Sequence, residues 1–151
     1  MEQQTTDFDT RVKLAVYRHF AQTGQRPASA EIAAHVGADA DQVREAFGRL
    51  RANRVLFLEP DGETIRMAPP FSGVPTQHRV IVGKREYVAN CAWDAFGILA
   101  ALHEPGTVIS ACAQSGERLE LPVGPDGPPP SEWVFHCLVP ASRWWADLVF
   151  T

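Results

Sequence analysis

Two side chains with proton and metal chemistry lie three residues apart in the second half of the chain, Cys91 and Asp94. On a helix this spacing places both on one face, so a thiol and a carboxyl group can share one small site. If Asn90 is the helix N-cap, Cys91 lies in the first turn, where free backbone N–H groups and the helix dipole favour the thiolate. A thiolate binds soft metals and attacks electrophiles. The alternative interpretation is a small buried cysteine beside an aspartate at a helix start.

The segments around this pair are predicted to form a small antiparallel-sheet lobe. A helix is expected from near Cys91 to about Leu102, and Pro105-Gly106 ends it. Apolar runs bounded by turn signals predict strands on both sides of the helix. These strands cover residues 78–82, 85–88, 107–112, 118–123 and 133–139. The C-x-x-D helix is therefore expected to lie against a sheet.

The first part of the chain has the pattern of three helices and a hairpin. Apolar residues recur at helical spacing over residues 8–20, and Ser29 can cap a short second helix. Asp39 and Gln42 form a capping-box pattern ahead of a third helix. Asp61-Gly62 then separates two short apolar runs, which indicates a hairpin. This order of elements is typical of a winged helix-turn-helix.

The domain organisation follows from these patterns. We expect a winged-helix-like lobe over residues 1–68, a Pro-rich connector over residues 69–75, and the sheet lobe over residues 76–151. The fold class is therefore predicted to be α+β. A chain of 151 residues can hold two small lobes that share a core, but not two full-sized domains.

The charges disfavour DNA binding by the first lobe. The N-terminal turn of the third helix, which would enter the major groove, carries Asp39, Asp41 and Glu45. DNA phosphates would repel these carboxylates. Four arginines that follow could contact a DNA backbone, although ordinary ion pairs on a solvated helix face explain them as well: Arg44, Arg49, Arg51 and Arg54. The formal net charge of −4 also provides no positive field toward nucleic acid or an anionic membrane.

Composition and cysteine use predict a cytoplasmic globular protein. Apolar residues make up 45% and charged residues 21% of the chain, as in ordinary globular domains. The polar, acidic first ten residues lack the features of a signal peptide, and no apolar run is long enough to span a bilayer. Cys91, Cys112 and Cys137 match no zinc-ribbon spacing, so they are expected to be free thiols in a reducing compartment.

The sequence around Cys91 resembles the organomercurial (alkylmercury) lyase family, in the order of its elements as well as in its residues. The resemblance is carried by REYVANCAWDAFGILAAL at 85–102, TVISAC at 107–112 and SGE at 115–117, and more loosely by VFHCLVP at 134–140 and by residues 144–151. In that family a winged-helix-like lobe precedes a strand, a C-x-x-D helix and a strand that ends in a second cysteine. The resemblance spans roughly residues 68–151.

The resemblance implies protonolysis of carbon–mercury bonds, which gives a hydrocarbon and Hg(II) in organomercury detoxification. Cys91 would capture the soft mercury, and Asp94 would take the thiol proton and return it to the departing carbon. Cys112 matches a cysteine that looks structural in the family, and its apolar strand predicts burial as an inert thiol. No cofactor is implied. The expected partners are a small organomercurial, and mercuric reductase or small thiols that accept Hg(II).

The sequence departs from the family pattern at its C-terminal end. The family generally uses a second catalytic cysteine that follows a segment similar to Asp147–Thr151, whereas this sequence ends at Thr151. Cys137 is the only obvious substitute as a second mercury ligand, and the other interpretation is a half-buried strand cysteine. We hypothesise that the core is C-terminally incomplete because the next codon is a stop-like codon read as selenocysteine. If the gene has no TGA there followed by family-like sequence, the hypothesis is wrong.

The sequence therefore predicts an organomercurial lyase, with two alternatives left open. One is a regulator or mercury-binding protein in which the first lobe contacts DNA and Cys91 only senses the metal. The other is a family member that acts as an interaction module without turnover. The four tryptophans are expected to fill the core or to line an apolar pocket for the organic group.

Overall fold

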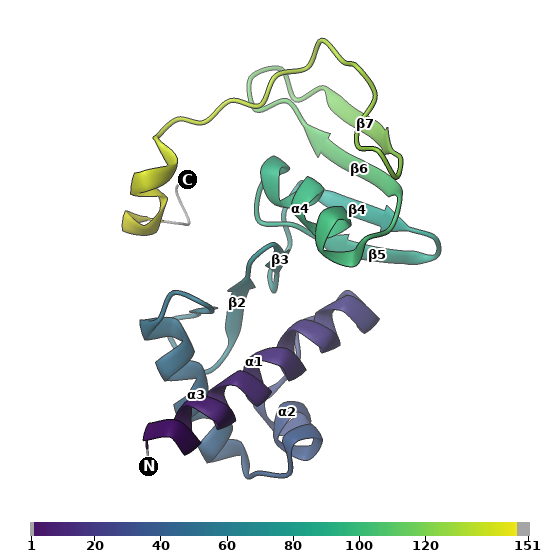
Figure 1. The fold of residues 1–151 in the computed structure, drawn as a ribbon. Helices are drawn as coiled ribbons and strands as arrows, with labels where there is room; N and C mark the ends of the chain where they lie inside the picture. Colours follow the sequence, from purple (N-terminus) through teal and green to yellow (C-terminus); the bar gives the residue numbers. More distant parts are fainter. Residues whose placement is uncertain (1, 148–151) are drawn as a thin grey trace.

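The computed structural model describes residues 2–147, which form a mainly helical part followed by a mainly β part (Figure 1). The first part contains α1 (Glu2–Thr23), α2 (Ser29–Val36), α3 (Ala40–Ala52), β1 (Phe57–Leu58), β2 (Ile65–Ala68) and β3 (Phe71–Ser72). The second part contains β4 (Arg79–Val82), β5 (Arg85–Val88), α4 (Ala92–Leu102), β6 (Gly106–Ala111), β7 (Arg118–Val123) and the 3-10 helix η1 (Ala141–Ala146). Helices and antiparallel sheets are combined, so the predicted α+β class is confirmed. Within residues 2–147, no helix has the length and apolar character to cross a membrane.

The helix ends in the first part follow local capping chemistry. At the start of α3, the Asp39 carboxylate accepts a 2.8 Å hydrogen bond from the Gln42 N–H, and the Gln42 side chain accepts one of 3.1 Å from the Asp39 N–H. The predicted capping box is therefore present. The prediction of Ser29 as a cap is wrong by one residue. Ala28 holds the cap position, because its N–H donates to the Glu31 carboxylate at 2.8 Å.

Two antiparallel sheets follow the helices. In the first, β2 pairs with both β1 and β3, so the predicted hairpin is confirmed and the Pro-rich segment contributes the short strand β3. The second sheet has the order β5-β4-β6-β7, with every pair antiparallel. A single bridge between Phe71 and Ala89 connects the first residue of β3 to the residue after β5. This bridge brings the first part against the start of α4.

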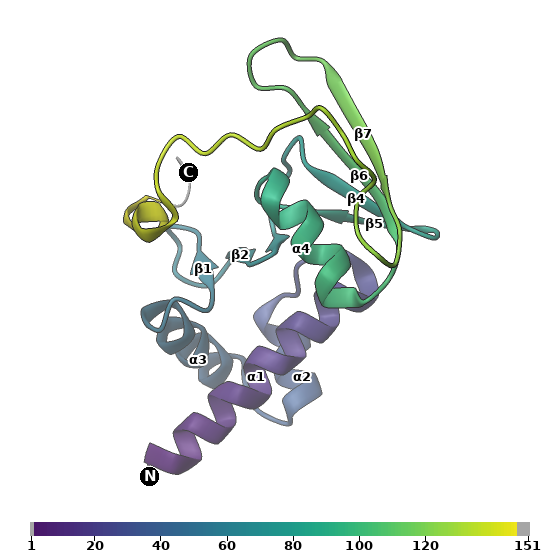
Figure 2. The same cartoon turned by 45° about the horizontal axis from the view of Figure 1, so that its top comes forward.

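The chain after β7 departs from the predicted strand at residues 133–139. That segment forms no strand, and its side chains are exposed, with Val134 87% and Leu138 71% accessible. A strand needs a neighbour for its backbone N–H and C=O groups, and β7 pairs only with β6 among the described residues. The segment instead crosses to the first part, where Trp145 of η1 lies 5.2 Å from the ring of Phe57 (Figure 2). The predicted apolar stretch at residues 148–151 lies outside the described residues.

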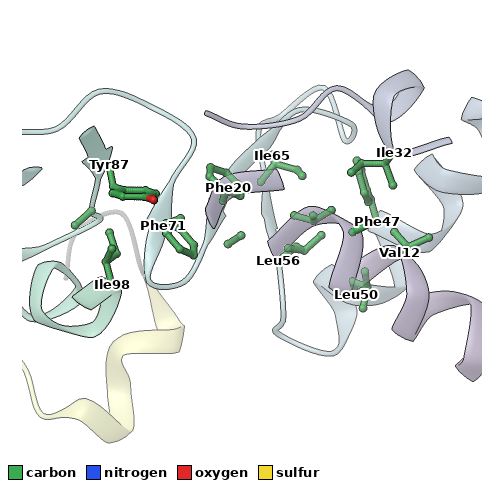
Figure 3. Packing of buried hydrophobic residues seen from close by; sticks show 14 of the residues in the cluster. Val12, Phe20, Ile32, Phe47, Leu50, Leu56, Ile65, Phe71, Tyr87 and Ile98 are labelled. Atoms are coloured by element: carbon green, nitrogen blue, oxygen red, sulfur yellow. The ribbon is translucent and has the colours of Figure 1, made fainter. Parts of the chain in front are cut away.

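One continuous core runs through both parts (Figure 3). Phe71 joins them, because its ring stacks on Phe20 of α1 at 5.3 Å and lies 5.9 Å from the ring of Tyr87 in β5. Tyr87 is fully buried, and its hydroxyl donates a 2.7 Å hydrogen bond to the carbonyl of Ala21. Ile98 of α4 lies near Tyr87 and Phe71 in the same cluster (Figure 3). The helix that carries Asp94 is thus fixed against both parts of the molecule.

Candidate functional site

Cys91 lies where the chain leaves β5 and enters α4. It is the N-cap residue, with extended backbone angles of φ −149° and ψ 178°. The prediction that Asn90 is the N-cap is therefore wrong by one residue. The Asn90 side chain is engaged elsewhere, since its Nδ2 donates to the carbonyls of Pro70 at 3.2 Å and Phe71 at 3.3 Å. Asp94 is then the third residue of α4, whose side chain lies next to the cap.

The Cys91 thiol and the Asp94 carboxylate interact at this half-buried helix end. Burial raises the pKa of the Cys91 thiol, and the negative charge of Asp94 and a hydrogen bond to its carboxylate raise it further, while the N–H groups of Asp94 and Trp93 oppose the rise. Burial also raises the pKa of Asp94, against hydrogen bonds from Asn90 and Cys91 that lower it. The predicted stabilisation of the thiolate by the helix end is thus outweighed by burial. The site holds its proton on sulfur, with an acceptor beside it.

The segment that carries Cys137 passes the start of α4. The ring of Phe135 lies 5.7 Å from that of Trp93, and these residues stand two positions from Cys137 and Cys91 respectively. Cys137 itself is exposed. Among residues 2–147, no group of three or more His, Cys, Asp or Glu side chains is arranged to hold a metal ion.

Cys112 is less buried than the sequence predicted, and the pKa of its thiol is lowered. It lies just beyond β6, in the turn toward β7, and is only half-buried. The Ser115 hydroxyl and the N–H groups of Ser115 and Gln114 lower the pKa of its thiol. The expectation of an inert buried thiol is therefore wrong, because the strand ends one residue earlier and the turn directs hydrogen-bond donors toward the sulfur.

An open cavity of about 480 Å³ lies between α1, the start of β1 and η1. It is lined by Lys13, Leu14, Tyr17, Arg54, Val55, Pro69 and Trp145. The Tyr17 hydroxyl donates to the carbonyls of Val55 at 3.3 Å and Pro69 at 3.2 Å. Burial and the charge of Asp94 both raise the pKa of Tyr17. One wall of this largely apolar cavity is therefore within electrostatic range of Asp94.

Sequence reasoning missed Tyr17 as a neighbour of the site, and it considered Asn90 only as the helix cap. Both side chains donate hydrogen bonds to carbonyls of residues 69–71, which are distant from them in the sequence. No local pattern predicts which carbonyl a distant side chain will meet. Only the packing of the two parts reveals these partners.

Comparisons with known proteins address the identity of the chain. The family model for alkylmercury lyase (MerB) matches residues 71–151, which is more than half of the chain and includes Cys91 and Asp94. A solved structure described as the mercury-bound form of MerB2 is similar to this chain with a TM-score of 0.57 and 21% identity, over 82% of this chain and 68% of that one. This likeness shows a shared fold. A search of curated proteins found no significant match. From the family match, the chain belongs to the alkylmercury lyase family.

Proposed function

We propose that this protein cleaves carbon–mercury bonds by protonolysis, at a site formed by Cys91 and Asp94. The observation that carries the proposal is the placement of the Cys91 thiol at the N-cap of α4 and of the Asp94 carboxyl at its third residue, both half-buried at the same helix end. This pair lies inside the region that matches the lyase family. The products are a hydrocarbon and Hg(II), and the biological role is organomercury detoxification.

The first step is capture of an organomercurial R–Hg–X by sulfur. The thiol proton moves to the Asp94 carboxylate, Sγ of Cys91 forms a bond to mercury, and X⁻ leaves. The raised pKa of Cys91 keeps the thiol protonated until the soft metal approaches. The Asp94 carboxylate then takes the proton, since it lies at the same helix end as the thiol, three residues from it.

The second step is proton delivery to carbon. Protonated Asp94 donates to the carbon atom as the carbon–mercury bond breaks, and the bonding electron pair stays with carbon. R–H leaves, and Hg(II) remains bound to Sγ of Cys91. The raised pKa of Asp94, which burial causes, favours the acid form that this step needs. A positioned general acid contributes about 10²–10⁴-fold to the rate of such a step.

We assign Cys137 as the candidate second sulfur ligand for Hg(II). Mercury bound to one thiolate readily accepts another soft ligand, and two sulfurs together hold it more firmly. The Trp93–Phe135 ring contact supports the assignment, because it brings the segment with Cys137 to the start of α4. Hg(II) then passes to a small thiol or to mercuric reductase, and no cofactor takes part.

The cavity beside Tyr17 provides space for the organic group. Its lining is aromatic and aliphatic apart from Lys13 and Arg54, which suits the apolar part of an organomercurial. The effect of the Asp94 charge on the pKa of Tyr17 supports the placement, because it puts this wall near the proton donor.

The proposal retains the predicted organisation into a winged-helix lobe (1–68), a connector (69–75) and a lyase core (76–151). The succession of α1, α2 and α3 followed by the β1–β2 hairpin supports it. The alternative of a DNA-binding regulator has less support, because Arg44 forms ion pairs with Asp41 and Glu63. Arg49 is likewise paired, since its Nη2 lies 2.8 Å from Oδ1 of Asp9. Carboxylates thus neutralise two of the cations that would meet DNA phosphates, Arg44 and Arg49.

Release of benzene from phenylmercury, in the presence of excess small thiol, tests the proposal. We expect the isosteric variants Cys91→Ser and Asp94→Asn to lose hydrocarbon release, while Asp94→Asn still binds mercury. Asp126→Asn, which changes an exposed loop carboxylate, is the matched control and should retain activity. Hydrocarbon release that survives in both site variants would overturn the assignment. Salt-sensitive DNA binding by a protein without turnover would support the regulator instead.

A further inference from the structure

Two cationic side chains line the cavity beside Tyr17, whose volume is about 480 Å³. Lys13 comes from α1 and Arg54 from the turn after α3, and the other described lining residues are aromatic or aliphatic. Neither cation forms a salt bridge within residues 2–147, whereas Arg44 and Arg49 each do. Among its described residues the cavity thus presents positive charge without a carboxylate to balance it, on walls that are otherwise apolar.

The backbone places Arg54 at this cavity in a conformation that is unusual for a residue with a side chain. Arg54 follows the C-cap of α3 and has a φ of +59°. Its N–H donates to the Arg51 carbonyl at 2.9 Å, and the N–H of Val55 donates to the Leu50 carbonyl at 2.9 Å. These two hydrogen bonds define a Schellman motif, in which glycine usually takes the left-handed position. The turn itself does not call for an arginine, so the use of one here requires another explanation.

The ring of Trp145 forms a flat wall beside Arg54. The guanidinium carbon of Arg54 lies 5.7 Å from the centroid of this ring, and the ring of Phe57 lies 5.2 Å from it on η1's contact with β1. A guanidinium can form two parallel hydrogen bonds with a carboxylate while it remains stacked on an aromatic ring. An aromatic ring that bears a carboxylate would therefore find an apolar surface and a matching charge together, in a cavity of ordinary size for a small ligand.

The other end of the cavity lies toward the helix that carries Asp94. The Tyr17 hydroxyl donates to the carbonyl of Pro69, which lines the cavity, at 3.2 Å. The next residue, Pro70, packs on α4, since a Cβ atom placed on Gly97 would be 3.3 Å from the Pro70 Cβ. Gly97 follows Asp94 by three residues, so the two lie on the same face of α4. The Pro69 end of the cavity is thus adjacent to the helix face that carries the reactive carboxyl.

The cations lie farther from α4 than this end does. Lys13 precedes Tyr17 by four residues and therefore lies one turn of α1 earlier. The later end of α1 is the one that contacts the sheet lobe, because the Ala21 carbonyl accepts a 2.7 Å hydrogen bond from the hydroxyl of Tyr87. A molecule that spans the cavity would consequently have one end near α4 and the other near the two positive charges.

We propose that Lys13 and Arg54 form an anion subsite that selects organomercurials whose organic group is aromatic and carries a carboxylate. This inference rests on the proposed function and names a substrate class for it. The mercury-bearing carbon would lie at the Pro69 end, the ring would lie against Trp145, and the carboxylate would accept hydrogen bonds from the guanidinium and the ammonium group. An unsubstituted phenyl group fills the apolar part of the cavity but leaves both cations to water.

The kinetic test compares 4-carboxyphenylmercury with phenylmercury in the parent and in the double variant Lys13→Gln/Arg54→Gln. The matched control is Arg18→Gln/Arg51→Gln, which removes the same charge from α1 and α3 at exposed arginines that do not line the cavity. We expect the first double variant to lower the ratio of kcat/KM for the carboxylated over the unsubstituted substrate by about tenfold, as the loss of charge-assisted hydrogen bonds would. The control should keep the parental ratio.

Two kinetic outcomes would overturn the inference. One is a ratio in Lys13→Gln/Arg54→Gln that stays within about twofold of the parental ratio, because a change that small is within the usual effect of an exposed charge. The other is an equal fall in the control, which would indicate a general effect of net charge on the approach of an anion.

A binding measurement without mercury separates this inference from the proposed function. The probes are 4-ethylbenzoate and its neutral counterpart 4-ethylbenzamide, and the signal is the Trp145 indole N–H in 15N–1H NMR spectra, assigned by its loss in Trp145→Phe. We expect the carboxylate to bind more tightly than the amide in the parent and in the control, and the preference to disappear in Lys13→Gln/Arg54→Gln. If the parent releases no hydrocarbon, the proposed function fails, while a carboxylate preference still demonstrates the anion subsite. Equal binding of the two probes by the parent, or binding of neither, would overturn the inference whatever the activity.

Discussion

Cys91 is the N-cap of α4 and Asp94 is its third residue, so the thiol and the carboxyl lie at the same half-buried helix end. Burial raises the pKa of both groups, so each favours its protonated form more than it would in water. An exposed pair with the same spacing would lose the proton to water more readily. The local geometry of one helix end therefore gives both a metal-binding sulfur and a proton carrier.

If Cys137 supplies the second sulfur, its removal will weaken retention of Hg(II). We expect Cys137→Ser to release Hg(II) to competing glutathione at about 10²-fold lower thiol concentration than the parent, since two tethered ligands act at high effective concentration. Mercury that stays with the protein after gel filtration measures this. Cys112→Ser is the control, because Cys112 lies in the β6–β7 turn. Equal retention in the parent and Cys137→Ser would exclude a two-sulfur site with Cys137.

The stability of the fold is expected to depend on the protonation of Asp94. Its folded pKa lies above the unfolded value, so the native state binds more protons, and stability falls as the pH rises through the folded pKa. Asp94→Asn removes this dependence. We therefore expect the variant to be more stable than the parent near neutral pH, with the difference shrinking at acid pH. Urea unfolding from about pH 4 to about pH 8 measures it. A variant less stable than the parent at every pH would contradict the prediction.

Cys112 is expected to react with iodoacetamide several-fold faster than Cys91 at neutral pH. The thiolate is the nucleophile, and the pKa of Cys112 is lowered by Ser115 and nearby N–H groups whereas burial raises that of Cys91. Mass spectrometry of the labelled peptides gives both rates. Ser115→Ala should slow the labelling of Cys112 and leave Cys91 unchanged. Faster labelling of Cys91 would show that its thiol is more ionised than the buried site allows.

Phe71→Ala is expected to destabilise the protein by about 3–5 kcal/mol, the usual cost of removing a buried phenylalanine. The Phe71 ring is 4% exposed and contacts the rings of both Phe20 and Tyr87, so its loss leaves a cavity where the two parts meet. Phe135→Ala is the control, since that ring is 46% exposed, and a much smaller change is expected. Urea unfolding of both variants measures the free energies. Similar losses of unfolding free energy in the two variants would show that the core does not depend on the contacts of Phe71 with Phe20 and Tyr87.

The sequence by itself predicted the features that depend on neighbouring residues. The capping box of Asp39 and Gln42 is present, and so are the neighbouring strands predicted at 78–82 and 85–88, because their hydrogen bonds involve positions only a few residues apart. The spacing of Cys91 and Asp94 likewise predicted that both would lie at one helix end. The order of helices and antiparallel strands, and the family, followed from the same local patterns and motifs.

The tertiary structure decided what depends on distant partners. Cys91 and not Asn90 is the cap, and the Asn90 side chain instead donates to the carbonyls of Pro70 and Phe71. Burial against the rest of the fold, which spacing cannot reveal, raises the pKa of Cys91 and so reverses the effect expected from the helix end. Residues 133–139 are apolar enough for a strand, yet they form none and do not pair with the edge of β7 that is free among the described residues. Hydrogen-bond partners and desolvation arise from packing, whereas spacing sets only which side chains can meet.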